Sequence, residues 1–127
     1  LVHQPQSAEL NFMMGESLWR TQQPDKAIPY LEAALRNQHD MLPAHAALGM
    51  ALSMLNRPNE AIQHLQQALT LDDDGSLHYD LARAYQAAGN PQGAQQMMRQ
   101  YQQIKEKNQE VDSELAKQAE ITAPETR

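Results

Sequence analysis

Three short motifs of the form Pro-x-x-Ala recur at almost equal intervals along this chain of 127 residues. They are Pro24-Asp25-Lys26-Ala27, Pro58-Asn59-Glu60-Ala61 and Pro91-Gln92-Gly93-Ala94. The alanines stand at residues 27, 61 and 94, so the interval is 34 and then 33 residues. A fixed period of this length is typical of proteins built from stacked repeats, in which each unit contacts its neighbours. The period therefore predicts a repeat architecture.

Each repeat reads as two helices joined by a short polar turn. The three prolines follow such turns, and proline is favoured at the first position of a helix, where its missing N–H would have no partner. Apolar residues on both sides of each turn recur at helical spacing, as in Leu10, Met13, Met14 and Leu18, and then Ala27, Leu31 and Ala34. The sequence thus predicts an all-α fold, an α-solenoid of antiparallel helix pairs.

The second unit carries His45-x2-Leu48-Gly49-x2-Leu52 followed by Ala61-x3-Leu65-x2-Ala68. This pattern resembles the tetratricopeptide repeat, with W-x2-L-G-x2-Y in its first helix and A-x3-F-x2-A in its second. The other two units follow it with Met14-Gly15-x2-Leu18 and Ala27-x3-Leu31-x2-Ala34, and with Leu81-Ala82-x2-Tyr85 and Ala94-x3-Met98-x2-Tyr101. The tryptophan position holds Asn11, His45 and His78 instead. The resemblance implies a right-handed superhelix of stacked pairs.

The register of the repeat also predicts the limits of the units. Pro5 stands 34 residues before His39, at the place of the proline that ends a repeat, so we expect the natural protein to continue upstream with further repeats. The expected divisions are the end of a preceding repeat at 1–7, repeats at 8–41, 42–74 and 75–107, a helix continuation or cap at 108–121, and a disordered tail at 122–127.

The segment after Ala94 contains no proline or glycine as far as Thr122, so the last helix is expected to be long. Its apolar residues Tyr101, Ile104, Val111 and Leu115 lie on one side. We favour a capping helix that folds back on the third repeat, because solenoids need capped ends. The alternative is a straight helix that projects and pairs with a second chain, giving a homodimer through the terminal helices.

Composition restricts the classes of function. The net charge of −6 argues against nucleic-acid binding, which needs clustered Lys and Arg. With no cysteine, the chain has no thiol nucleophile and no cysteine-based zinc site. No apolar run approaches the roughly 20 residues that span a bilayer. We expect a soluble protein, cytoplasmic or periplasmic.

The acidic stretch Leu71-Asp-Asp-Asp-Gly-Ser-Leu-His-Tyr-Asp80 is the one segment that suggests a metal site. A calcium loop needs a glutamate six residues after its glycine, and Leu81 stands there instead. We therefore interpret Asp72 to Asp74 as acceptors for the free N–H groups of a helix that begins near Ser76. No cofactor motif or catalytic constellation is present, so we predict no metal, no cofactor and no enzyme activity.

In the tetratricopeptide family the first helices of the repeats line a groove that binds partner segments. The resemblance implies that the groove of this chain is formed by Phe12, Glu16, Trp19, Arg20, Met50, Met54, Tyr79, Arg83 and Gln86. We expect a non-catalytic scaffold that binds a protein or peptide, and we expect Trp19→Ala and Arg83→Glu to weaken binding without loss of stability. The alternatives are a homo-oligomerisation or assembly module and a regulatory or targeting domain of a larger protein.

Overall fold

A computed structural model describes residues 7–122, and the regular secondary structure of this part of the chain consists of helices joined by short turns and loops. The helices are α1 (Ala8–Arg20), α2 (Pro24–Asn37), α3 (Leu42–Met54), α4 (Pro58–Gln67), the short 3-10 helix η1 (Leu69–Leu71), α5 (Ser76–Ala87) and α6 (Pro91–Thr122). The second helix of each pair begins at a proline of the repeat motif, as predicted. The all-α solenoid expected from the sequence is confirmed.

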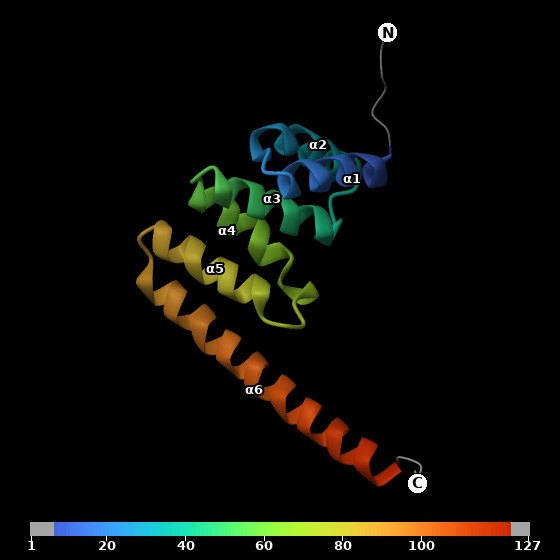
Figure 1. Cartoon of the computed structure of the whole chain (residues 1–127). Helices are drawn as coiled ribbons and strands as arrows, with labels where there is room; N and C mark the ends of the chain where they lie inside the picture. The colour runs from blue at the N-terminus through green and yellow to red at the C-terminus, as the bar shows by residue number, and fades with distance from the viewer. Residues whose placement is uncertain (1–6, 123–127) are drawn as a thin grey trace.

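The helices stack as three antiparallel pairs, α1 with α2, α3 with α4 and α5 with α6 (Figure 1). Each second helix also packs against the first helix of the next pair, so that α2 contacts α3 and α4 contacts α5. The turn inside each pair is alike, since Gln22, Asn56 and Gly89 all have positive φ angles of 67°, 59° and 80°. A residue in this left-handed conformation commonly ends a helix and lets the chain reverse.

A continuous core of small and aliphatic side chains holds the pairs together. Its largest fully buried side chains are Leu31, Leu48, Leu65 and Leu81. The core includes alanines on both helices of the pairs, because small side chains allow the helix axes to approach closely. The histidine that replaces the family's tryptophan in the second repeat, His45, is buried, with only 6% of its surface exposed.

The long last helix does not fold back, contrary to the arrangement that we favoured from the sequence. It is unbroken from Pro91 to Thr122, and its C-terminal half extends beyond the stack (Figure 1). Val111 is 47% and Leu115 61% exposed. The physical reason is that a helix can reverse only where a turn interrupts it, and no proline or glycine interrupts α6 after Gly93.

The limits of the repeats stay our proposal, although helix pairs begin at Ala8, Leu42 and Ser76. Ser7 caps α1 by accepting a hydrogen bond from the N–H of Leu10. The rest of the expected preceding repeat, residues 1–6, lies outside the described residues, as do residues 123–127 of the expected tail. Thr122, which we had assigned to that tail, is the last residue of α6, and its hydroxyl donates to the carbonyl of Gln118 at 2.8 Å.

Candidate interaction groove

A cavity of about 330 Å³ lies between α3 and α5, the first helices of the second and third repeats. It is partly enclosed and partly open to solvent. Both helices contribute because adjacent first helices run side by side in the stack (Figure 1). The residues that line the cavity are Met50, Ser53, Met54, Asn56, Pro58, Asp80, Arg83, Ala84 and Ala87. We refer to this set as the α3–α5 groove.

The two walls of the α3–α5 groove differ in chemistry. The α3 wall presents two thioether side chains, and Met54 is 41% exposed. The α5 wall presents Asp80 and the exposed guanidinium of Arg83. Burial raises the pKa of the Asp80 carboxyl, while the positive charge of Arg83 acts in the opposite direction. The groove can therefore contact an apolar side chain on one wall and a polar or charged group on the other.

Three of the nine residues predicted for the groove, Met50, Met54 and Arg83, line this cavity together. The sequence prediction did not include the small residues Ala84 and Ala87 or the turn residues Asn56 and Pro58. The two alanines could have been found from spacing, because Ala84 lies four residues after Asp80 and Ala87 lies four residues after Arg83 on one side of the helix. No spacing pattern pointed to Asn56 and Pro58, because residues at the junction of α3 and α4 come close to the groove only in the folded stack.

The predicted residues of α1 lie outside the cavity. Phe12 and Trp19 are half-buried and pack against the hydrophobic core. The indole Nε1 of Trp19 is buried and has no hydrogen-bond partner among the described residues. The guanidinium of Arg20 lies 5.3 Å from the centre of the Trp19 ring and pairs with Glu16 at 3.3 Å. Trp19→Ala is therefore expected to cost stability, which corrects our expectation from the sequence.

The two remaining predicted residues are on α5. Tyr79 packs against Tyr101 of α6 with the two rings tilted relative to each other and their centres 5.4 Å apart, and Tyr79 is 42% exposed. This contact places Tyr79 on the side of α5 that meets α6. Gln86 is exposed but does not line the cavity. Partner binding at these two residues and at the α1 residues stays a prediction.

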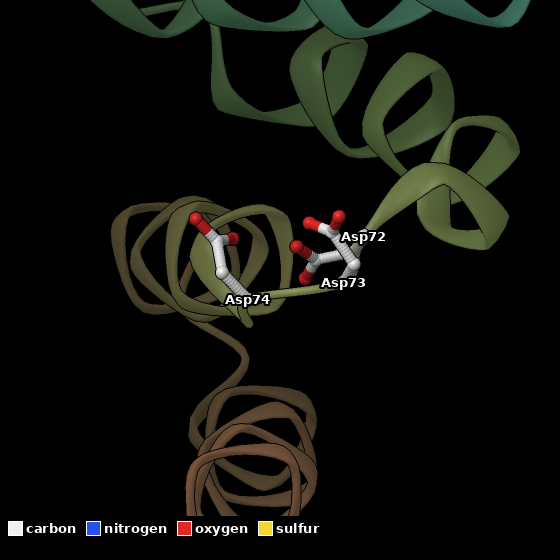
Figure 2. Close-up of side chains that lie close together, drawn as sticks. All are labelled: Asp72, Asp73 and Asp74. Carbon is white, nitrogen blue, oxygen red and sulfur yellow. The ribbon is translucent and has the colours of Figure 1, made fainter. Parts of the chain in front are cut away.

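The acidic loop before α5 is held by hydrogen bonds. Figure 2 shows Asp72, Asp73 and Asp74 with their carboxylates on the same side of the loop, and one oxygen of each lies within 4.8 Å of the others. Asp72 accepts from the N–H of Gly75 at 3.0 Å, from the N–H of His78 at 2.9 Å and from the ring Nδ1 of His78 at 2.7 Å.

Asp74 completes the cap of α5. Its carboxylate accepts from the N–H of Ser76 at 2.9 Å, and this hydrogen bond lowers the pKa of Asp74. The capping role predicted for these aspartates is confirmed for Asp72 and Asp74. Gly75, with φ of 89°, makes the turn between them and the helix.

Comparison with protein families gives two overlapping matches to the tetratricopeptide repeat, at residues 6–74 and 52–117. The first match alone spans more than half of the chain. The chain belongs to the tetratricopeptide repeat family. Its fold is accordingly that of a protein-interaction scaffold. None of the helices within residues 7–122 is both long enough and apolar enough to cross a membrane.

Several solved structures are similar to this chain. MamA AMB-1 matches with a TM-score of 0.72 and 25% identity, over 80% of this chain and 61% of that chain. MamA MSR-1 matches with a TM-score of 0.72 and 24% identity, over 80% of this chain and 59% of that chain. The TPR domain of Arabidopsis FLU matches with a TM-score of 0.66 and 20% identity, over 74% of this chain and 90% of that chain. A search of curated proteins found no match. The chain thus spans about three fifths of the length of the MamA chains.

Proposed function

We propose that this chain is a non-catalytic scaffold that binds an extended segment of a partner protein in the α3–α5 groove. The observation that carries the proposal is the groove itself, in which Met50, Met54 and Arg83 line one cavity that is partly open to solvent. Methionine adapts to partner side chains of irregular shape, and arginine is among the residues that most often dominate binding energy. An apolar side chain would contact the methionines, and a carboxylate or carbonyl oxygen would accept from Arg83.

Binding can be tested with peptides selected from a display library against the 127-residue chain. Fluorescence anisotropy then compares the wild type with Arg83→Glu, Met54→Glu and the control Arg99→Glu, an exposed arginine of α6 outside the groove. We expect Arg83→Glu and Met54→Glu to raise Kd about tenfold or more, equivalent to roughly 1.4 kcal/mol. The control should change Kd less than about twofold, and all three melting temperatures should stay near the wild-type value because the side chains are exposed.

Peptides that bind all three variants as tightly as the wild type would place the binding surface elsewhere and contradict the proposal. Unfolding of Arg83→Glu would instead show that Arg83 has a structural role.

Assembly through α6 is the second candidate, favoured by the exposure of Val111 and Leu115. The apolar side of α6 is, however, already partly used by its own repeat. Asn108 donates to the carbonyl of Asp73 at 3.0 Å, and the ring of Tyr101 packs against that of Tyr79. A long coiled-coil seam with a second chain would have to displace these contacts. Sedimentation equilibrium tests this candidate, and a monomer at high concentration would exclude it.

A further inference from the structure

The first helices of the first two repeats match residue by residue. The helices α1 and α3 have 13 residues each, and they begin at residues 8 and 42, which are 34 apart. Gly15 meets Leu31 across the first pair in the same way that Gly49 meets Leu65 across the second. Residues of α1 and α3 that are 34 apart therefore occupy equivalent places in their repeats.

The place of Ser53 in α3 is held by Trp19 in α1. Ser53 lines the α3–α5 groove, on the side of α3 that faces α5. The equivalent side of α1 faces α3, and Trp19 is half-buried there and packs against the core cluster that includes residues of α3. An aromatic ring thus occupies the space between α1 and α3, whereas the equivalent space between α3 and α5 is a cavity of about 330 Å³.

The cavity is large enough to hold such a ring. An apolar cavity of about 150 Å³ is sufficient to bind benzene, so the α3–α5 groove has room for the larger indole. The short side chain of Ser53 leaves this space unfilled. The backbones of α3 and α5 also come close over a shorter stretch than those of α1 and α3, which widens the groove further.

The charged and thioether groups of the groove complement an aromatic ring. The face of such a ring carries negative electrostatic potential, so a cation over it is attracted. The first repeat contains this arrangement, since the guanidinium of Arg20 lies 5.3 Å from the centre of the Trp19 ring. In the groove, Arg83 is available for the same contact, and the sulfur atoms of Met50 and Met54 are suited to the ring edge.

The groove also offers an acceptor for an indole N–H, which the first repeat lacks. The Nε1 of Trp19 is buried and has no hydrogen-bond partner among residues 7–122. On the wall opposite Trp19, α3 carries Ala47, and the residue equivalent to Ala47 in α5 is Asp80. The carboxylate of Asp80 lines the cavity and can accept a hydrogen bond from a bound indole.

On the basis of the proposed function, we propose that the α3–α5 groove selects a tryptophan side chain of the partner segment. The bound indole takes the place between α3 and α5 that Trp19 takes between α1 and α3. Its face meets the guanidinium of Arg83, and its N–H donates to the carboxylate of Asp80.

The first experiment uses small amides as probes and isotope-labelled methionine methyl groups as reporters. The chain is titrated with N-acetyltryptophanamide, N-acetylphenylalaninamide and N-acetylleucinamide, and the methyl resonances are followed by NMR. We expect the tryptophan amide to shift the resonances of Met50 and Met54 upfield through its ring current, and to leave that of the exposed Met13 in place. The phenylalanine amide should bind roughly threefold more weakly and the leucine amide roughly tenfold more weakly.

The second experiment fills the groove with a side chain of the protein itself. Ser53→Trp places an indole where the first repeat has Trp19. The matched control is Gln86→Trp, because Gln86 holds the equivalent position in the third repeat, is exposed and does not line the cavity. We expect Ser53→Trp to raise the melting temperature by about 3 °C and the Kd of the selected peptides by about tenfold or more. The control should change them by less than about 1 °C and about twofold.

The outcomes separate this proposal from the proposed function. Peptides that Ser53→Trp displaces, but that bind equally well after their aromatic residues are replaced by leucine, would overturn the tryptophan proposal and leave the scaffold function standing. Peptides that remain bound to Ser53→Trp would contradict both.

Equal affinity for the tryptophan amide and either of the other amides would also overturn the tryptophan proposal. So would methyl shifts of Met50 and Met54 that follow the concentration of the chain without any amide, because the occupant would then be a second copy. If Ser53→Trp unfolds, the titrations of the wild-type chain decide the question.

Discussion

Close contact between helices of a pair depends on single glycines. A Cβ added to Gly15 would lie 2.5 Å from Cγ of Leu31, and one added to Gly49 would lie 2.6 Å from Cγ of Leu65. Both leucines are fully buried. The glycines are therefore required by packing, because neither has the positive φ angle that would favour glycine for conformational reasons.

Gly49→Ala separates packing from helix propensity. Propensity alone would raise the free energy of unfolding by about 1 kcal/mol, whereas an overpacked core costs about 1–3 kcal/mol. We expect a net decrease of about 1 kcal/mol in the free energy of unfolding measured by urea denaturation, because the fully buried Leu65 would have to move to make room for the added Cβ. Ser53→Ala, on the exposed side of the same helix, is the control. A Gly49→Ala variant more stable than the wild type would contradict this account.

Two histidines pack face to face between α3 and α4. The ring Nδ1 atoms of His45 and His64 are 3.0 Å apart, and Nε2 of His45 lies 2.9 Å from the carbonyl of His39. Because a carbonyl only accepts, Nε2 of His45 carries a proton, so its neutral ring accepts at Nδ1 from His64. A proton on Nδ1 of His45 would place its N–H opposite the Nδ1–H of His64, where neither group can accept a hydrogen bond.

This pair makes stability depend on pH. Burial lowers the pKa of His64 below its ordinary value of 6.5, a positive charge on the His45 ring would lower it further, and Glu60 opposes the shift. The unfolded chain therefore binds a proton at higher pH than the folded chain. The contribution of His64 is complete above pH 6.5 and is lost as the pH falls from that value through the lower pKa of the folded chain.

We expect the free energy of unfolding to decrease below pH 6.5, and to decrease less steeply in His64→Gln than in the wild type. Urea denaturation at several pH values measures both slopes, with His39→Gln, an exposed ring, as the control. Parallel slopes for His64→Gln and the wild type would exclude His64 as the cause.

Among the elements, α6 has an N-terminal part that packs on the stack and a C-terminal part that is exposed to solvent. Its N-terminal part is packed, with Ala94 and Met97 buried, and Asn108 makes its last described hydrogen bond to another element. The residues from Lys105 to Thr122 are all exposed. An isolated helix of this length is only marginally stable in water, so the projecting half depends on propagation from the packed half.

Removal of the residues after Gln109 should therefore leave the melting temperature within about 2 °C of the wild type, because no core contact is lost. Helical ellipticity should fall, and amide exchange in residues 110–122 of the intact chain should be much faster than in residues 94–104. A large drop in melting temperature on truncation would show that this half packs on the stack in solution.

At the scale of the whole molecule, the fold is a stack in which each pair contacts its neighbours (Figure 1). Stability in such a stack is approximately a sum of repeat terms and interface terms. A destabilising substitution in a terminal helix pair should consequently lower the stability of that pair more than the stability of the other pairs. This property separates the chain from a globular domain with a single cooperative core.

Leu31→Ala tests this behaviour, because Leu31 is fully buried in the first pair. We expect a loss of about 2–5 kcal/mol in that pair. Hydrogen exchange should accelerate more in α1 and α2 than in α5 and α6. The counterpart Leu81→Ala should reverse the order. Equal acceleration in all helices would show a single cooperative unit.

The amino-acid sequence by itself determined the class of fold and the starts of the helices. The reason is local: proline is favoured at the first position of a helix, where Pro24, Pro58 and Pro91 stand, and apolar spacing marks which side of each helix is buried. The same local rules identified Asp72 and Asp74 as caps of α5. Family membership followed from these positions together with Gly15, Gly49 and the recurring alanines.

The tertiary structure alone decided which predicted groove residues meet. Met50, Met54 and Arg83 share a cavity because α3 and α5 lie side by side, whereas Trp19 packs on the core and Tyr79 turns to Tyr101 of α6. It also decided that α6 projects. A helix has several exposed sides, and sequence spacing cannot say which of them a neighbouring pair will cover, because that depends on contacts between residues far apart in the chain.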